Sequence, residues 1–304
     1  MATAVVCAYS LVGRKALEAL LDCGIKVVAL YTYKQPEEDR WFESPADFAI
    51  GHGIPIFFEP NINAPHVLDH IKKLEPDFLF SFYFREMIRP ELLSVPKIGA
   101  FNLHGSMLPK YRGRAPINWV LVRGETNTGI SLHSMTAKPD DGDIFGQTEI
   151  PIAWDDTALS LTKKTAEAGY ELLREKVPLL SKSELIGIPQ KSLGLSSYFG
   201  GRKPGDSRLT SQMTAHHAFN QIRAVADPWP NAFIESSLGM IKIAWALPCS
   251  GECVAGHFKR SDDGVIFGFS DAPLRLISLK KGTEKSDAPD VFAEWLRAIG
   301  VKEC

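Results

Sequence analysis

The sequence predicts an α/β fold in which a large, mostly parallel sheet is followed by a smaller β domain. In the amino-terminal part, short apolar runs alternate with segments of helical spacing, a pattern typical of a parallel sheet with helices on both faces. After the glycine-rich run 200–205, short alternating runs replace this pattern. The change predicts two domains, residues 1–200 and residues 201–304.

The amino-terminal elements are expected to alternate regularly along the chain. An apolar run at 4–8, helical spacing at 11–21 that ends at Gly24, and an apolar run at 27–31 predict a strand, a helix and a strand. Later segments predict strands at 54–58, 78–83, 99–103, 130–135 and 144–150, with helices at 67–74 and 158–180. The turn at 8–13 lacks the first two glycines of a dinucleotide fingerprint. We therefore expect a Rossmann-like sheet without an NAD site.

The carboxyl-terminal part carries a different pattern. The turn formers at 200–205 indicate a linker, and a helix is expected at about 216–226. Alternating runs at 241–247, 264–269 and 274–279 then predict a small antiparallel β domain.

Composition argues against several classes of function, although a local basic patch remains possible. The chain has 304 residues, of which 45% are hydrophobic, and 34 Lys and Arg against 36 Asp and Glu give a formal charge of -2. This balance offers no bulk attraction for nucleic acid or an anionic membrane. The amino terminus has no basic segment before an apolar one, and no apolar run approaches the roughly 20 residues that cross a bilayer. We therefore expect a soluble, cytoplasmic protein.

The cysteines indicate reduced thiols rather than a disulfide framework. Their number is odd, and they are scattered at Cys7, Cys23, Cys249, Cys253 and Cys304. Cys249 and Cys253 have no partner pair or histidine at zinc-finger spacing, so no metal is expected.

Asn102 and His104 form the most informative motif. A histidine in a loop is more often structural than catalytic, but these two residues end a predicted strand and are separated by one residue. In an extended segment, alternate side chains point to the same side, so both can face one pocket. His104 can act as a base, since an imidazole has a pKa of about 6.5, and the Asn102 amide can donate to an oxyanion. This pair suits acyl transfer to an amine.

Asp140 is the candidate third member of the site. It lies in the acidic turn 139–143, which could also be a solvated loop or a cation site. The full calcium-loop pattern is missing, so a metal is the weaker interpretation. A carboxylate hydrogen-bonded to His104 would instead fix the imidazole tautomer and raise its basicity.

Two basic pairs on glycine-containing loops indicate an anionic ligand. Arg112 with Arg114, and Arg202 with Lys203, would by default be solvated charges. Guanidinium groups nevertheless bind phosphate or carboxylate through two hydrogen bonds, so a diphosphate is a natural ligand.

The motif of Asn102 and His104, the run Leu-Pro-Lys-Tyr-Arg-Gly at 108–113 and Asp140 before Gly-Asp-Ile together resemble the 10-formyltetrahydrofolate-dependent formyltransferase family. The resemblance spans nearly the whole chain. Segments 80–83, 114–119 and 223–230 most resemble the sugar-nucleotide branch, in particular the formyltransferase domain of the bifunctional polymyxin-resistance enzyme, which formylates UDP-4-amino-4-deoxy-L-arabinose.

This resemblance implies a Rossmann-like amino domain, an OB-like carboxyl domain and transfer of a formyl group from 10-formyltetrahydrofolate to a UDP- or dTDP-linked amino sugar, in lipid A or O-antigen biosynthesis. Asn102 would stabilise the transition state, His104 would transfer protons, and Asp140 would raise the histidine pKa. The implied folate-binding residues are Glu86, Met87, Ile88, Arg114, Thr136, Ala137, Lys138, Pro139 and Asp140. The implied sugar-nucleotide residues are Tyr83, Arg112, Asn118, Trp119, Arg202 and Lys203. A homo-oligomer is compatible with the sequence.

Two alternatives remain at this stage. A methionyl-tRNA formyltransferase would share the three catalytic residues, but binding of nucleic acid favours excess positive charge. Residues 203–304 contain 12 Lys and Arg and 12 Asp and Glu, a balance of zero. A non-catalytic folate or nucleotide binder would have no need of all three catalytic residues.

Overall fold

The computed structural model describes residues 1–304, apart from the side chain of Glu38. The chain forms two compact units, which are described separately. The first consists of Met1–Pro116, Asn127–Ile152 and Leu161–Gly200. The second consists of Ile117–Thr126, Ala153–Ser160 and Gly201–Cys304.

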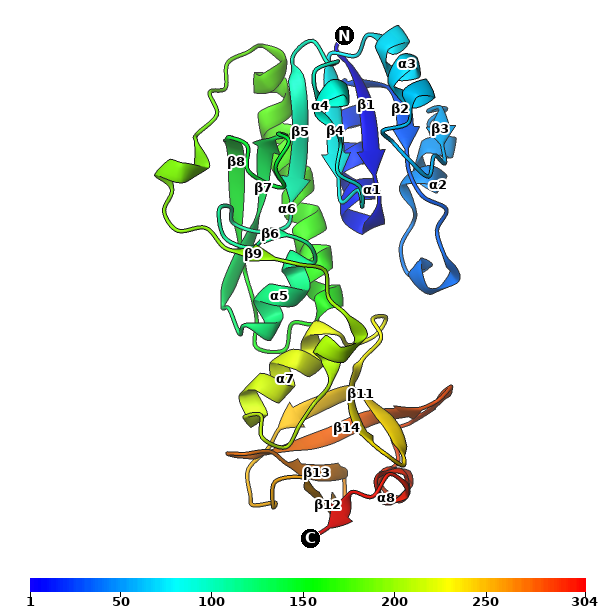
Figure 1. Ribbon diagram of the computed structural model, residues 1–304, viewed down its shortest axis with the longest axis vertical. Coiled ribbons are helices and arrows are strands. Elements are labelled where there is room, and N and C mark those ends of the chain that lie inside the picture. Colours follow the sequence, from blue (N-terminus) through cyan, green and yellow to red (C-terminus); the bar gives the residue numbers. More distant parts are fainter. The chain divides into compact units, whose positions relative to one another are not determined.

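The first unit is built on a seven-stranded sheet with the order β3-β2-β1-β4-β5-β7-β8 (Figure 1). Its strands are β1 (Thr3–Ala8), β2 (Lys26–Tyr31), β3 (Ile56–Phe57), β4 (Phe78–Phe82), β5 (Gly99–His104), β7 (Asn127–Ser134) and β8 (Ile144–Pro151). The strands from β3 to β5 are parallel, whereas β7 and β8 are antiparallel to their neighbours. The prediction of a mostly parallel sheet is confirmed.

Helices cover this sheet in the expected alternation. They are α1 (Ser10–Asp22), α2 (Pro45–Gly51), α3 (Pro65–Leu74), α4 (Pro90–Leu93) and α6 (Ala158–Ser181). Helix α1 packs against β1, β2 and β4 through its apolar face. Every residue of β4 is buried, as expected for a central strand covered on both faces. Helix α2, which was not predicted, begins at Pro45 after the Ser44 side chain, which accepts a hydrogen bond from the Asp47 amide.

Helix α6 determines which face of β5 is available for a site. Gly169 of α6 approaches β5 so closely that an added Cβ would lie 3.0 Å from Leu103. Leu103 therefore faces the helix, and its neighbours on β5, Asn102 and His104, face the opposite side.

A small two-stranded sheet lies outside the main one. Strand β6 (Arg112–Gly113) pairs in parallel with β9 (Tyr198–Phe199), and the 3-10 turn η2 (Gln190–Ser192) precedes β9. Neither short strand was predicted, because two residues carry no periodicity.

The second unit is built on a separate sheet with the order β10-β11-β14-β13-β12-β16, and β15 pairs with β14. The strands are β10 (Ala232–Ser236), β11 (Gly239–Pro248), β12 (His257–Ser261), β13 (Gly264–Gly268), β14 (Pro273–Lys281), β15 (Glu284–Ser286) and β16 (Lys302–Glu303). The helices are α5 (Pro116–Val122, all but its first residue), α7 (Ala215–Ala224) and α8 (Pro289–Ala298). The predicted carboxyl-terminal sheet domain is confirmed, although α5 and α8 were missed. Within the described chain, no helix is long and apolar enough to span a membrane.

Candidate active site

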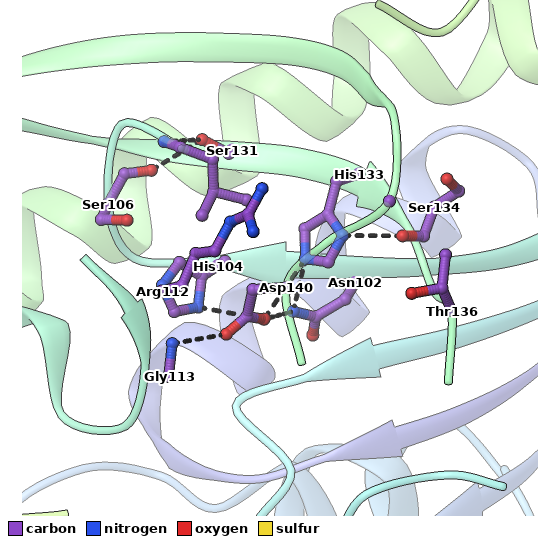
Figure 2. A network of polar contacts seen from close by, with 12 residues as sticks. Asn102, His104, Ser106, Arg112, Gly113, Ser131, His133, Ser134, Thr136 and Asp140 are labelled. Atoms are coloured by element: carbon purple, nitrogen blue, oxygen red, sulfur yellow. Dashed lines mark hydrogen bonds and ion pairs between the residues drawn. The ribbon is translucent and has the colours of Figure 1, made fainter. Parts of the chain in front are cut away.

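Strand β5 presents Asn102 and His104 on one face, next to His133 of β7 (Figure 2). The antiparallel register places Asn102 directly opposite His133. Directly opposed residues on neighbouring strands point to the same face. Three side chains able to form hydrogen bonds therefore meet on one small area of the sheet.

Asp140 joins this group from the loop that follows β7. Its Oδ2 accepts a hydrogen bond from the Gly113 amide at 2.8 Å, and its Oδ1 lies 3.3 Å from Asn102 Nδ2 and 3.5 Å from His104 Nδ1. The structure thus brings together the three residues that the sequence singled out, from two separate segments of the chain (Figure 2).

The tautomer of His104 is set by the backbone. His104 is only 6% exposed, and its Nε2 lies 2.8 Å from the carbonyl oxygen of Tyr111. A carbonyl can only accept, so Nε2 carries the hydrogen and Nδ1 of the neutral ring is unprotonated. The sequence analysis assigned the orienting task to Asp140, but in the structure Asp140 faces the other nitrogen, the one that can accept a proton.

The charge states of this pair follow from burial and proximity. Burial lowers the pKa of His104 below its usual value, and the nearby Asp140 carboxylate opposes this only in part. Burial alone would raise the pKa of Asp140, but His104, His133 and the Gly113 amide together hold it well below the usual range. At neutral pH the site therefore holds a neutral His104 beside an ionised Asp140.

His133 is a member of the site that the sequence analysis missed. It is 2% exposed, and its Nδ1 lies 2.7 Å from the backbone carbonyl of Ser134, so Nδ1 carries a hydrogen. In the neutral ring, Nε2 then accepts a hydrogen bond from Asn102 Nδ2 at 2.9 Å. The Asn102 amide thus directs one hydrogen to His133 and the other, over the longer distance of 3.3 Å, to Asp140. Only the register of β5 and β7 could have revealed this contact.

The loop around β6 supplies the backbone groups that hold His104 and Asp140. Tyr111, Gly113 and Ala115 all have positive φ, at 58°, 98° and 54°. A Cβ at Gly113 would lie 2.2 Å from the carbonyl oxygen of Phe199, so only glycine fits beside β9. Backbone strain of this kind persists where surrounding structure enforces it. Here the pairing of β6 with β9 enforces it.

The acidic turn 139–143 is held by other protein groups. Asp141 accepts a hydrogen bond from Arg112 Nη1 at 2.6 Å, and Asp140 binds the groups described above. No three histidine, cysteine, aspartate or glutamate side chains gather as metal ligands in the part of the chain that the structure describes. The carboxylates of Asp140 and Asp141 therefore accept hydrogen bonds from protein groups.

The proposed folate-binding residues come from two loops that border one apolar cluster. Ile88, in the loop after β4, is 5% exposed and belongs to the same cluster as Ala100, and Met135, just before the loop 136–140, packs against it. Met87 beside Ile88 is 49% exposed. Arg114 and residues 136–139 are exposed, whereas Glu86 accepts a hydrogen bond from the Ile62 amide.

A cavity of about 360 Å³ opens beside the Asp140 turn. It is lined by Arg112, Lys138, Pro139, Asp141, Ser196, Ser197 and Tyr198. A larger cavity of about 490 Å³ lies among residues 34–58 and is lined by none of the residues that contact His104. The smaller cavity is lined by Pro139 and Asp141, the neighbours of Asp140 in sequence, but not by Asp140, Asn102 or His104.

Of the proposed sugar-nucleotide residues in the first unit, Arg112 is engaged within the protein. Its Nε and Nη2 donate to Gln190 and its Nη1 donates to Asp141, so it braces the turn. Tyr83 has a left-handed backbone (φ 57°), and within the described residues its buried hydroxyl has no hydrogen-bond partner. Burial raises the pKa of that hydroxyl.

The others lie in the second unit. Asn118 is 9% exposed and donates to the Ala224 carbonyl at 2.6 Å, so the structure gives it a packing role. The Arg202 guanidinium lies 4.9 Å from the Trp119 ring centre, a favourable cation–π distance. Its Nη2 donates to the Asp206 carbonyl and to Ser207, while Nε and Nη1 are buried with no hydrogen-bond partner among the described residues. Lys203 is exposed.

The fold and the site together define a two-unit α/β protein with a histidine–carboxylate–carboxamide centre. Residues 11–177 match the formyl transferase family and residues 202–294 match the formyl transferase C-terminal domain. The chain belongs to the formyl transferase family.

Solved structures share the fold at low sequence identity. The sugar 3N-formyl transferase WlaRD, crystallised with dTDP and 5-N-formyl-THF, is 21% identical over 91% of this chain and 97% of its own, with a TM-score of 0.70. An N-formyltransferase from Helicobacter canadensis, in complex with folinic acid and dTDP-3-aminofucose, is 21% identical over 94% of this chain and all of its own, with a TM-score of 0.71. HypX from Aquifex aeolicus, in complex with tetrahydrofolic acid, is 16% identical over 99% of this chain but only 48% of its own, with a TM-score of 0.67.

Proposed function

We propose that this protein is an N-formyltransferase that moves a formyl group from 10-formyltetrahydrofolate to the amine of a nucleotide-linked amino sugar. The observation that carries the proposal is a neutral, buried His104 whose unprotonated Nδ1 faces an ionised Asp140, next to the Asn102 amide. Such a centre can accept a proton from an amine and stabilise a tetrahedral oxyanion.

The reaction begins when the amine nitrogen of the sugar attacks the formyl carbon. A carbon–nitrogen bond forms, and negative charge develops on the formyl oxygen. The Asn102 hydrogen directed at Asp140 is the more weakly held of the two, at 3.3 Å against 2.9 Å, so it is the one available to an oxyanion that forms on that side of the amide. His133 keeps the other hydrogen and so holds the amide in place.

Proton transfer follows at His104. The amine proton moves to Nδ1, and the resulting imidazolium is paired with Asp140 at 3.5 Å. When the bond from the formyl carbon to the folate nitrogen breaks, the same proton passes from Nδ1 to that nitrogen. Tetrahydrofolate and the N-formyl sugar are released, and His104 returns to its neutral form.

The folate would be held by the loop 86–88, Arg114 and the loop 136–140. The exposed Met87 offers an apolar surface for a flat ring, and both loops border the cluster around Ala100. Structures of WlaRD and of the Helicobacter canadensis enzyme with reduced folates support a reduced folate as the co-substrate.

The acceptor is proposed to be UDP-4-amino-4-deoxy-L-arabinose, on the strength of segments 80–83, 114–119 and 223–230. A dTDP-linked amino sugar is the second candidate, because the two sugar formyltransferases of similar fold were crystallised with dTDP or dTDP-3-aminofucose. Arg202 would bind the diphosphate, because a guanidinium can donate two hydrogen bonds to phosphate oxygens and its Nε and Nη1 have no partner among the described residues. In this assignment the domain of residues 1–200 carries the catalytic residues, and the domain of residues 201–304 forms most of the second unit, which also includes residues 117–126 and 153–160. The cytoplasmic product would enter lipid A or O-antigen.

The test is to incubate the full chain with 10-formyltetrahydrofolate and a panel of acceptors. The panel contains UDP-4-amino-4-deoxy-L-arabinose, dTDP-linked 3- and 4-amino sugars and methionyl-tRNA, and mass spectrometry detects the N-formyl product. The His104→Ala variant should lose turnover but still bind folate. Tight folate binding by the wild-type protein without any formylation would instead support a binding protein, and formylation of methionyl-tRNA alone would overturn the sugar assignment.

A further inference from the structure

Gln190 is a nearly fully buried glutamine whose side chain is saturated with hydrogen bonds. It is 3% exposed and begins the turn η2. Its Nε2 donates to the carbonyl oxygens of Asp140 at 2.9 Å and Gly142 at 2.7 Å. Its Oε1 accepts from Arg112 Nε at 3.1 Å and Nη2 at 2.8 Å. One carboxamide therefore links the Asp140 turn to strand β6.

The turn that Gln190 holds has little freedom of its own. Asp140 has a left-handed backbone with φ of 48°, a conformation uncommon for residues other than glycine but less unfavourable for aspartate than for most. A Cβ at Gly142 would lie 1.9 Å from the carbonyl oxygen of Ser134, so the turn lies tightly against the end of β7. Arg112, itself held by Gln190, also binds Asp141. Gln190 therefore fixes the backbone on both sides of Asp141.

We propose that Gln190 is a positioning residue for the formyl transfer proposed above: it holds the Asp140 backbone so that the carboxylate stays between Asn102 and His104. The expected effect on the rate rests on the proposed function, whereas the expected effect on the position of Asp140 does not. The contacts of Asp140 with the Gly113 amide and His104 depend on where its backbone stands, and a displacement of about 1 Å can cost about 100-fold in rate.

A positioning role predicts a change that a merely structural role would not produce. Besides burial, three groups shift the pKa of His104. They are Asp140 on the loop, the Tyr111 carbonyl on the segment before β6 and His133 on β7. If Asp140 moves away, the main group favouring the charged imidazole is lost. The pKa of His104 then falls, as it should when the Asp140 carboxylate itself is removed.

The experiment compares Gln190→Met with Gln147→Met in the 304-residue chain. Methionine has similar length but no amide, and Gln147 is a matched control because its Nε2 donates to the Leu108 carbonyl and Ser131 instead of the turn. We expect Gln190→Met to lower kcat about 10- to 100-fold with KM within about threefold, and NMR titration to show a lower His104 pKa. Gln147→Met should leave that pKa unchanged.

The NMR titration of His104 tests the role of Gln190 independently of the proposed function. An unchanged His104 titration in folded Gln190→Met protein, or an equal shift in Gln147→Met, would overturn the positioning role. Failure of the wild-type protein to formylate any amine would overturn the proposed function, while the titration would still decide the role of Gln190. If Gln190→Met does not fold, Gln190→Glu takes its place, because its carboxylate can still accept from Arg112 but cannot donate to the two carbonyls.

A second, independent feature is a pair of thiols in contact in the second unit. Cys253 and Cys304 are 51 positions apart in sequence, yet their sulfur atoms lie 3.4 Å apart. Each residue has a further contact in the second unit: the Cys304 amide donates to the Phe258 carbonyl, and the Cys253 thiol donates to the His257 carbonyl. The sulfur atoms must approach each other by about 1.4 Å to reach the length of a disulfide bond.

We infer that Cys253 and Cys304 form a reversible disulfide in the presence of a disulfide oxidant such as oxidised glutathione. The exposed Cys304 thiolate attacks the oxidant and releases one glutathione. Cys253 then attacks the mixed disulfide and releases the second, so two thiols are oxidised while the oxidant is reduced to two glutathione thiols. Burial and the hydrogen bond with Cys304 raise the pKa of Cys253 to about 12, so this second step is slow at neutral pH.

The test treats the reduced protein with oxidised glutathione and follows it by intact mass and thiol titration. We expect the loss of two hydrogen atoms and of two of the five thiols, with a cross-linked peptide containing Cys253 and Cys304. Cys249→Ser should behave identically, because the Cys249 thiol contacts a backbone carbonyl and no other thiol. Cys253→Ser should stop at a glutathione adduct on Cys304. The same adduct as the sole product in the wild-type protein, or a cross-link to Cys249, would overturn the inference.

Discussion

Replacing Asp140 by asparagine removes the charge that faces His104 while keeping the shape of the side chain. The two groups lie 3.5 Å apart. At an effective dielectric constant of about 20, opposite unit charges at this distance attract by about 5 kcal/mol before any competing contact is counted. Asp140 also contacts His133 and the Gly113 amide, so we expect the commonly observed effect of about 1–3 pKa units.

The direction of the change follows from the neutral state of His104. Burial already lowers its pKa, and loss of the Asp140 charge lowers that pKa further. Because the neutral ring is the base, activity is lost as pH falls through this pKa, so the acidic limb of kcat/KM should move to lower pH by about 1–3 units. The plateau kcat should fall about 10- to 1000-fold, since the imidazolium loses its counter-charge.

The assay measures initial rates of tetrahydrofolate release across the pH range with a saturating acceptor. Asp141→Asn serves as the matched control, because Asp141 contacts Arg112 and an asparagine oxygen can still accept that hydrogen bond. Its acidic limb should coincide with that of the wild-type protein. An Asp140→Asn profile that is unmoved, or displaced to higher pH, would refute the charge states derived for the site.

Further predictions concern the residues around this pair. His133→Ala removes the hydrogen bond that holds the Asn102 amide. Steady-state kinetics should show kcat lowered about 10- to 100-fold with little change in KM. Gly113→Ala should destabilise the protein by about 2–4 kcal/mol in thermal unfolding, whereas Gly200→Ala, with open space at its Cβ, should not. Arg202→Ala should weaken binding of diphosphate sugars more than folate in calorimetry; equal losses would indicate misfolding.

Much of the fold could be predicted from apolar periodicity. The runs at 4–8 and 27–31 and the helical spacing at 11–21 correspond to β1, β2 and α1. The antiparallel direction of β7 and β8 could not be derived in this way, because alternation along a strand is the same in both directions. The strands β6 and β9 were missed for a related reason, since each has two residues and is defined by its distant partner.

In the candidate site too, residues within one strand could be predicted from the sequence, whereas contacts between distant segments could not. Asn102 and His104 were identifiable because strand alternation places them on one face whatever the rest of the fold does. Gln190 was not identifiable, because a single glutamine in an irregular segment gives no signal until its contacts with Asp140 and Gly142 are known. The sequence analysis assigned Arg112 to a phosphate because its contacts within the protein could not be predicted. In the structure its guanidinium donates hydrogen bonds to Gln190 and Asp141.

The chemical role of His104 depends on a backbone group rather than on a motif. The Tyr111 carbonyl fixes the hydrogen on Nε2, and it can do so because Tyr111 adopts a positive φ of 58° beside β6. If that carbonyl turned away, the hydrogen could move to Nδ1, where it would bind Asp140, and the base would face the wrong group. The short pairing of β6 with β9 therefore decides which imidazole nitrogen accepts the proton, although neither strand carries a catalytic side chain.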